Sequence, residues 1–140
     1  MKKIWLLIVL SCLTWSCSEN DFNNNNPYLP NYSFSITIDL NLPAYNNLLY
    51  PSNGITYSGP GVGAKGTIIV FNTGSGYVAY DAACPNQSVN SCSVMTINGI
   101  NAVCSCDKVE YSLYTGLGSK EYPMKPYRVS VNGNMIRVYN

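Results

Sequence analysis

The first clear hydrophobic pattern in the chain begins just after residue 33. Apolar side chains occupy every second position and share one face of an extended segment: Phe34, Ile36, Ile38, Leu40 and Leu42. Strict alternation over this length indicates a half-buried β-strand, because successive side chains of a strand point to opposite faces. The following stretch, LPAYNNLLYPSNG, breaks the alternation and ends the predicted strand.

Tight-turn signals divide the second half of the chain into further strands. Gly74 and Gly76 can supply the positive φ angles of one turn, and Asn98-Gly99 and Asn132-Gly133 predict two more. Extended apolar segments flank these turns in pairs: 66–72 with 77–81, 94–97 with 100–103, and 127–131 with 135–139. No stretch of about 11 residues has a helical period. The pattern predicts an all-β fold, a small antiparallel β-sandwich or barrel.

Composition excludes several classes of function. The 140 residues are 46% hydrophobic and only 11% charged, which is sufficient for one domain with a real core. Without Lys2 and Lys3, six basic residues face seven acidic ones, so nucleic-acid binding is not expected. The chain has no histidine, which excludes histidine catalysis and histidine metal ligands. No spacing of acidic residues indicates an acid/base pair, and no enzymatic activity is expected.

The N-terminus is typical of an export signal. Lys2 and Lys3 precede an apolar stretch, 4–10, that continues in diluted form to Trp15 and is too short to span a bilayer. No arginine is present there, so export of the unfolded chain is expected.

Two cysteines in this region, Cys12 and Cys17, each follow a serine and resemble the lipobox of bacterial lipoproteins. Cys17 is the favoured lipid attachment site and Cys12 the second candidate; an ordinary secretory signal is the alternative. The predicted parts are a signal peptide at 1–16, a flexible Asn-rich tether at 17–32, and a β domain at 33–140. The lipid would anchor the protein to a bacterial membrane in the cell envelope, with the outer membrane favoured.

Two cysteine boxes follow predicted strands in the domain. Cys84-Pro85-Asn86 comes after the strand ending at Asp81, and Cys104-Ser105-Cys106-Asp107 comes after the strand ending near residue 103. Seventeen residues separate the boxes, and a predicted hairpin joins them, so both can lie at the same end of one sheet.

This arrangement resembles the Rieske [2Fe–2S] family, whose boxes read C-x-H and C-x-x-H, with two cysteines on one iron and two histidines on the other. Asn86 and Asp107 stand where the histidines belong. Flanking segments also resemble the family, so the similarity runs from about residue 66 to 140. The resemblance implies a Rieske-like β-sandwich or barrel with a small subdomain of two cluster-type loops.

Both departures from the family pattern fall on the same iron. An Asn86 amide is a poor iron ligand, and an Asp107 carboxylate would lower the potential of a cluster. Unfolded export would also deliver bare thiols to an oxidising compartment. A cluster-free domain is therefore expected. If a cluster is bound, its ligands are Cys84, Cys104, Asp107 and Asn86, with Cys106 as a substitute.

Four domain cysteines allow three disulfide pairings, and the sequence alone does not choose among them. A Cys104–Cys106 bridge is disfavoured because a single intervening residue strains it. The Rieske resemblance implies Cys92–Cys106, which copies the loop-to-loop disulfide of respiratory Rieske proteins, and Cys84–Cys104, which joins two former ligand positions.

Three functions follow from these features. The first is a membrane-anchored Rieske-like domain without a cluster, in a structural or binding role. The second is electron transfer through an atypical [2Fe–2S] centre. The third is a soft-metal or redox-thiol site at Cys104 and Cys106, for example for copper(I).

Overall fold

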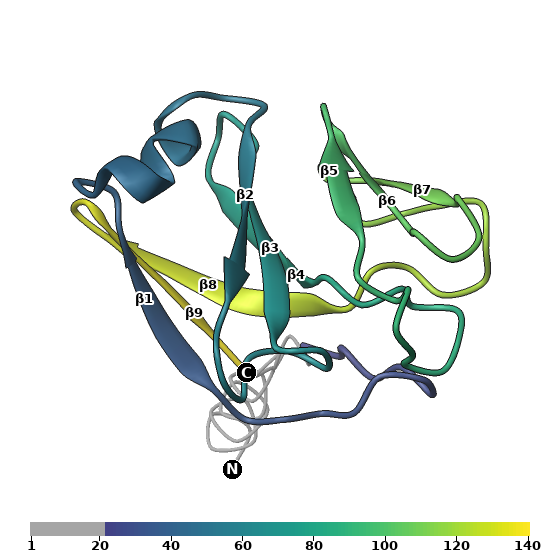
Figure 1. The fold of residues 1–140 in the computed structure, drawn as a ribbon. Helices are drawn as coiled ribbons and strands as arrows, with labels where there is room; N and C mark the ends of the chain where they lie inside the picture. Colours follow the sequence, from purple (N-terminus) through teal and green to yellow (C-terminus); the bar gives the residue numbers. More distant parts are fainter. Residues whose placement is uncertain (1–21) are drawn as a thin grey trace, which may run out of the picture.

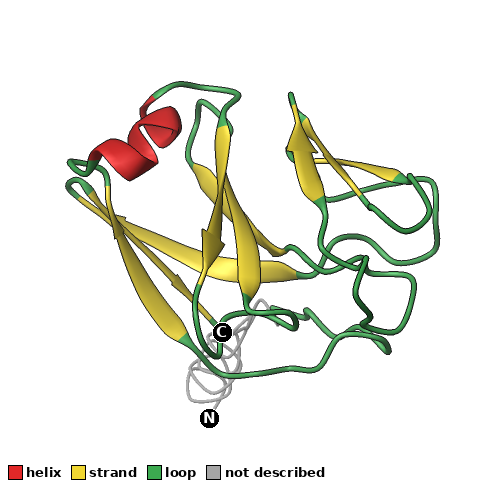
Figure 2. Cartoon of the chain, viewed as in Figure 1, coloured by secondary structure: helices red, strands yellow, loops and turns green. Residues whose placement is uncertain are grey.

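A computed structural model describes residues 22–140 and contains two antiparallel sheets. The larger sheet has six strands in the order β1-β9-β8-β4-β3-β2, and the smaller has three in the order β5-β6-β7 (Figure 1). Loops and one short 3-10 helix make up the rest (Figure 2). The elements are β1 (Ser35–Asp39), η2 (Pro43–Leu49), β2 (Gly54–Ser58), β3 (Thr67–Asn72), β4 (Tyr77–Asp81), β5 (Thr96–Asn98), β6 (Asn101–Val103), β7 (Glu110–Ser112), β8 (Pro126–Asn132) and β9 (Met135–Tyr139). The all-β prediction is confirmed.

The central strand β3 organises the interior, because all six of its residues are buried. Ile68 and Val70 on one face belong to a core shared with β1, η2, β8 and β9. Ile69 and Phe71 on the other face belong to a second core, which includes the cysteine loops and the small sheet. A strand buried on both faces reads as a continuous apolar run, which explains the sequence TIIVFN.

The alternating stretch near the N-terminus forms β1, but it ends earlier than the pattern predicts. Ile38 and Leu40 are buried, whereas Leu42 is exposed. The Asp39 carboxylate accepts a hydrogen bond from the Asn41 N–H, and the Asp39 carbonyl accepts one from the Leu42 N–H. These bonds turn the chain, so Leu42 leaves the face that it was predicted to share.

Both asparagine-glycine turns form, displaced by one residue. Asn98 pairs with Asn101, so the loop residues are Gly99 and Ile100; in the last hairpin Asn132 pairs with Met135. Gly99 has φ of 61°, which is the geometry of a type II′ turn with glycine in the first loop position. In each turn only the glycine, Gly99 or Gly133, has a positive φ, so the preceding asparagine remains paired as the last residue of its strand.

The segment 22–32 differs from the flexible tether expected over 17–32. Leu29 and Asn24 are buried against the domain. The Asn24 amide donates hydrogen bonds to the carbonyl of Pro126 and the side chain of Asn140. The predicted signal peptide and the two candidate lipid attachment sites, Cys12 and Cys17, lie outside the described residues. Within residues 22–140, no helix has the length and apolar character needed to cross a membrane.

Candidate functional site

The candidate site consists of two loops beside the small sheet. One loop connects β4 to β5 and contains Cys84 and Cys92; the other connects β6 to β7 and contains Cys104 and Cys106. Backbone hydrogen bonds fix the base of the first loop, from the Cys84 N–H to the Ser93 carbonyl and from the Met95 N–H to the Ala82 carbonyl, both 2.7 Å. The β5–β6 hairpin therefore places both loops at one end of the molecule.

Two disulfides join these loops. Cys84 is bonded to Cys104 with the Cα atoms 5.6 Å apart, and Cys92 is bonded to Cys106 with the Cα atoms 5.1 Å apart. These are the two pairs that the Rieske resemblance implies. The first bridge is almost fully buried in the second core, whereas Cys92 is exposed and Cys106 is half-buried.

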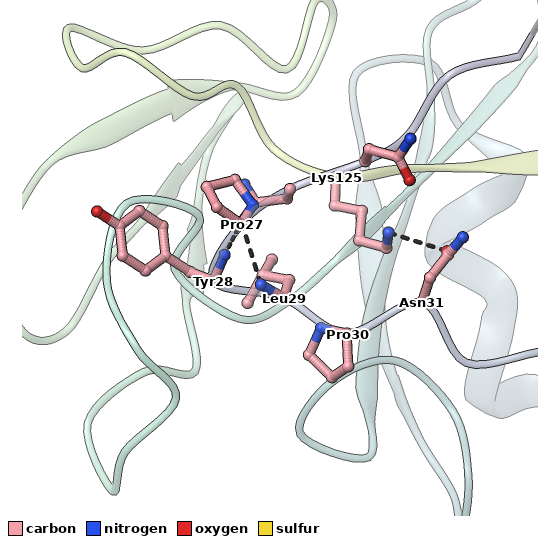
Figure 3. Close-up of a pocket in the computed structure, with 8 residues that line it drawn as sticks. Pro27, Tyr28, Leu29, Pro30, Asn31 and Lys125 are labelled. Atoms are coloured by element: carbon pink, nitrogen blue, oxygen red, sulfur yellow. Dashed lines mark hydrogen bonds between the residues drawn. The ribbon is translucent and has the colours of Figure 1, made fainter.

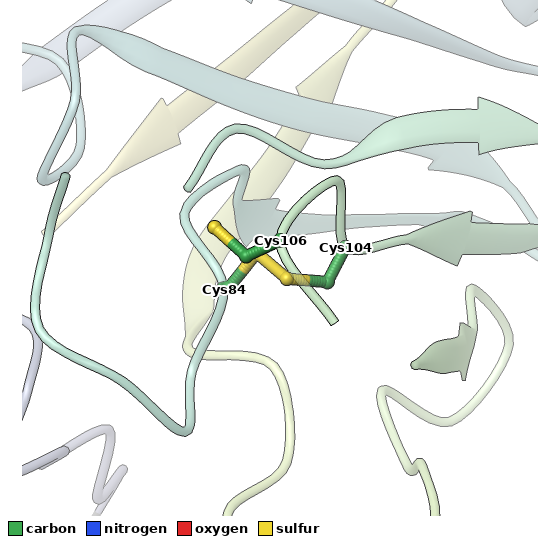
Figure 4. A group of neighbouring side chains, drawn as sticks. All are labelled: Cys84, Cys104 and Cys106. Carbon is green, nitrogen blue, oxygen red and sulfur yellow. A yellow bond between two sulfur atoms is a disulfide. The ribbon is translucent and has the colours of Figure 1, made fainter. Parts of the chain in front are cut away.

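The two bridges lie against each other. The Sγ atoms of Cys84, Cys104 and Cys106 all lie within 4.8 Å of one another. Figure 4 draws these three side chains together, with the disulfide between Cys84 and Cys104. Three sulfurs at this spacing suit a soft metal ion only as thiolates, because the thiolate is the metal ligand. In the structure all three are in disulfides.

Asn86, in the first histidine position, is held by three hydrogen bonds within the protein. Its amide nitrogen donates to the Tyr111 hydroxyl at 3.0 Å and to the Tyr122 carbonyl at 2.7 Å. Its amide oxygen accepts from the Tyr122 N–H at 2.9 Å. The Asn86 side chain therefore ties the first loop to the chain after β7.

Asp107, in the second histidine position, forms a salt bridge with Lys120 at 2.7 Å and accepts a hydrogen bond from the Val109 N–H. Burial opposes ionisation of this carboxyl, but the hydrogen bonds from Lys120 and Val109 and the positive charge of Lys120 outweigh it and lower its pKa. The two histidine positions thus bind neighbouring parts of the chain, and not each other.

The four Rieske ligand positions consequently do not fit a [2Fe–2S] cluster in this arrangement. Two are sulfurs of one disulfide, and two are side chains with partners inside the protein. An iron–sulfur cluster needs thiolates, and a Rieske centre needs two imidazoles on its second iron.

Sequence reasoning did not predict a buried lysine next to the site. Lys125 is only 2% exposed, and its ammonium group donates hydrogen bonds to the Asn24 carbonyl at 2.7 Å and the Asn31 side chain at 3.1 Å. Burial lowers its pKa, and the charge of Asp81 opposes this shift. Figure 3 shows Lys125 beside the segment 27–31. Lys125 and the segment 25–31 line a hollow of about 540 Å³. The sequence held little signal for this contact, because one acceptor is a backbone carbonyl, which any residue carries, and the other is the side chain of a single asparagine, Asn31.

Asp81 lies fully buried behind the first loop. Its carboxylate accepts hydrogen bonds from the Tyr127 hydroxyl and from the N–H groups of Ala64 and Ala83, at 2.7 to 2.8 Å. Burial raises the pKa of Asp81, and these hydrogen bonds oppose the shift. Since every partner of Asp81 belongs to the scaffold, its role is to fix the end of β4 from which the first loop begins.

Comparison with known proteins identifies the fold. No protein-family model and no curated protein matches the chain. A chain from the complex of reduced oxygenase and oxidized ferredoxin in carbazole 1,9a-dioxygenase is 17% identical, with 75% of this chain and 92% of that chain aligned and a TM-score of 0.51. The apo form of the quaternary ammonium Rieske monooxygenase CntA is 14% identical, with 76% of this chain and 32% of that chain aligned and a TM-score of 0.52.

These similarities, together with the sheet order and the two bridged loops, define a Rieske-like domain. In this domain the two loops are bridged by disulfides, and Asn86 and Asp107, at the positions compared with the histidines, bond to other parts of the protein.

Proposed function

We propose that this protein is an exported, lipid-anchored lipoprotein whose Rieske-like domain has lost its iron–sulfur cluster and has a structural or binding role. One observation carries the proposal. The two cysteines in ligand positions are bonded to each other, while Asn86 and Asp107 are engaged by Tyr122 and Lys120. Loops that hold a cluster present free ligands toward a common point, whereas these loops are closed by bonds between their own side chains.

The disulfides also support a place outside the cytoplasm. Structural disulfides form and persist in oxidising compartments and are rare in the cytosol. The short apolar segment after Lys2 and Lys3 supports export, and Cys17 is the proposed attachment site of the lipid.

The packed segment 22–32 gives the anchor a structural consequence. Phe22 follows Cys17 by five positions, a distance of at most roughly 18 Å in an extended chain. Because the Phe22 ring stacks with Arg128 of β8 at 4.6 Å and Asn24 is bonded to Pro126, the lipid would hold this side of the domain close to the membrane surface. The Asn26 amide also donates a hydrogen bond to the Pro85 carbonyl at 2.9 Å, so the first cysteine loop would be fixed relative to the bilayer as well.

Iron and thiol analysis tests the loss of the cluster. The protein is purified from an iron-replete native host and titrated for thiols under denaturing, non-reducing conditions. We expect colourless protein with no reactive thiol in the domain. Stoichiometric iron together with two or more free thiols per chain would overturn the proposal and favour the atypical [2Fe–2S] alternative.

Substitution of the lipobox cysteines tests the anchor. Cys17→Ser should move the protein from the membrane fraction to the soluble fraction and remove the mass of the lipid. Cys12→Ser is the matched control and should remain in the membrane fraction. A reversal of these two results would assign the lipid to Cys12. If both variants and the unaltered protein were all found in the soluble fraction, lipidation would be excluded.

A further inference from the structure

The two disulfides differ in access to solvent although their sulfurs are neighbours. Cys84 and Cys104 are 2% and 0% exposed, so an external thiol cannot reach their bond in the folded protein. Cys92 is exposed, and its partner Cys106 is half-buried. Cys106 Sγ lies within 4.8 Å of both sulfurs of the buried bridge. One cysteine of the accessible bridge therefore contacts the inaccessible bridge.

We propose that the two disulfides form a thiol–disulfide relay, in which Cys106 carries reducing equivalents from an external dithiol to the buried Cys84–Cys104 bridge. The substrate class is a dithiol, either a dithiol protein of the same compartment or a small dithiol. The inference requires both disulfides but neither the lipid anchor nor a particular binding role.

The first step opens the accessible bridge. A thiolate of the external dithiol attacks Cys92 Sγ, forms a mixed disulfide with it, and releases Cys106 as a thiolate. The second thiol of the reductant then attacks the reductant sulfur that is bonded to Cys92, which closes a disulfide within the reductant and releases Cys92 as a thiol. The reductant becomes a disulfide, and two electrons and two protons reach Cys92 and Cys106.

The second step transfers the bond without a change in electron count. The Cys106 thiolate can attack either sulfur of the buried bridge. Attack on Cys104 would form a disulfide across a single residue, which is strained. Attack on Cys84 forms a Cys84–Cys106 bridge and releases Cys104 as the thiolate, so this direction is favoured.

Two side-chain amides are placed to support this exchange. The Gln87 amide nitrogen lies 3.7 Å from Cys104 Sγ and can donate a hydrogen bond to the departing thiolate. The Asn90 carbonyl oxygen lies 3.0 Å from Cys92 Sγ and 3.4 Å from Cys106 Sγ, where it can accept hydrogen bonds from the thiols of the opened bridge. Gln87 thus faces the sulfur that leaves as a thiolate, and Asn90 faces the two sulfurs that are thiols once the reduction is complete.

The third step completes the relay. The new bridge contains Cys106, which is half-buried, so a second dithiol can reduce it by the same two-stage exchange. The domain thus takes up four electrons and four protons from two dithiols and becomes a four-thiol form. Each dithiol leaves as a disulfide, so the oxidised domain acts as a disulfide-forming acceptor; in the opposite direction, the four-thiol form would reduce external disulfides.

Two single substitutions test the transfer step directly. In Cys92→Ser, Cys106 has no partner, and the relay predicts exchange to Cys84–Cys106 with the free thiol on Cys104. In the matched variant Cys106→Ser, the free thiol stays on Cys92 and Cys84–Cys104 stays intact. The folded proteins are acid-quenched, denatured and alkylated with N-ethylmaleimide at acidic pH, and the labelled and bridged peptides are identified by mass spectrometry. A free thiol found only on Cys106 in Cys92→Ser, with Cys84–Cys104 intact, would overturn the relay.

A reduction experiment on the unaltered protein keeps the test independent of variant folding. One equivalent of dithiothreitol followed by the same quench should give label on Cys92 and Cys104 and a Cys84–Cys106 peptide. Reduction of the buried bridge should be at least about tenfold slower in the Cys92→Ser/Cys106→Ser double variant, because an intramolecular attack is lost. Label confined to Cys92 and Cys106, or an equal rate in the double variant, would show two independent disulfides. The cluster-free proposal would then stand, since its test is the iron and free-thiol content of the protein as purified.

Discussion

The six-stranded sheet and the two cysteine loops are held together by different means. In the sheet, four of the five neighbouring strand pairs are matched over five positions and β4 with β8 over two. Strand β3 contributes apolar side chains to a core on each face. In the loop region the strands β5, β6 and β7 have three residues each, and two disulfides and the bonds of Asn86 supply the connections. Strand pairing and burial thus stabilise the sheet, whereas the loop region adds covalent and polar links to its share of the second core.

This difference shows which bonds connect the two cysteine loops in this Rieske-like fold. A [2Fe–2S] cluster would join the two loops through the cysteines and the histidine positions. Here Cys84–Cys104 joins the same pair of cysteine positions, while Asn86 and Asp107 connect each loop to the segment 120–122. Direct bonds therefore connect both loops to each other and to the chain after β7.

The largest effect is expected where the two regions meet. Phe71 of β3 is fully buried and packs edge-on against Tyr114, with ring centroids 5.0 Å apart, and the Tyr114 hydroxyl bonds to Ser52. Phe71→Ala should lower the free energy of unfolding by about 3–5 kcal/mol, because it removes a large buried side chain and leaves a cavity. Urea unfolding measures this, with the exposed Val131→Ala as control. A loss below about 1 kcal/mol would show that the sheet does not support the loops.

Removal of each disulfide separates the two covalent links. Cys84→Ala/Cys104→Ala opens a loop of sequence separation 20, and Cys92→Ala/Cys106→Ala opens one of 14. Losses of about 2–4 kcal/mol are typical for such bridges. The first pair should cost more, because its sulfurs also pack in the second core. Urea unfolding of the two double variants under identical conditions gives the comparison, and a larger loss from the exposed pair would contradict it.

Most of the sheet could be predicted from sequence because its signals are local. Alternation marked β1, the apolar run 66–72 marked β3, and Gly99 fixed a hairpin to within one residue. Strand β2, helix η2 and the three-residue β7 were not predicted, because their apolar residues follow no sustained period. These elements form through contacts with β3 and the loops rather than through their own pattern.

The site was predictable only where the spacing of rare residues constrains it. The two boxes and their seventeen-residue separation predicted the loop pair, because cysteines are rare and their spacing can be recognised directly in the sequence. The partners of Asn86, Asp107 and Lys125 were not predictable. Tyr122 lies 36 residues from Asn86 in the chain, and Asn24 lies 101 residues from Lys125. Contacts between common polar residues at such separations leave no periodic signal.

Asn86→Ala tests the hydrogen bonds between Asn86, at the first histidine position of the family pattern, and Tyr122. The substitution removes three hydrogen bonds and leaves the Tyr122 carbonyl and N–H without these partners. We expect a loss of about 2 kcal/mol in the free energy of unfolding, the usual cost of unpaired polar groups at a partly buried site. Asn86→Asp is the matched control: it can still accept the Tyr122 N–H but cannot donate to the Tyr122 carbonyl, so its loss should lie between those of Asn86→Ala and the unaltered protein. An equal stability of all three would show that Asn86 does not tie the loops.

The smallest effect is expected at Asp107, which forms an ion pair with Lys120 at the protein surface. Its hydrogen bonds and the charge of Lys120 lower its pKa in the folded protein, so the unfolded state binds more protons in the pH range between the two values. The stabilisation from Asp107 is therefore present above the unfolded pKa, near 3.9, and is lost as the pH falls through the lower folded value. An NMR titration of the Asp107 side chain measures the shift, and Lys120→Met should return it toward the ordinary value. Because exposed ion pairs are screened by salt, high ionic strength should reproduce part of the effect of Lys120→Met. An Asp107 pKa unchanged by Lys120→Met would show that the pair does not persist in solution, and the second histidine position would then be free of the link that the first retains through Asn86.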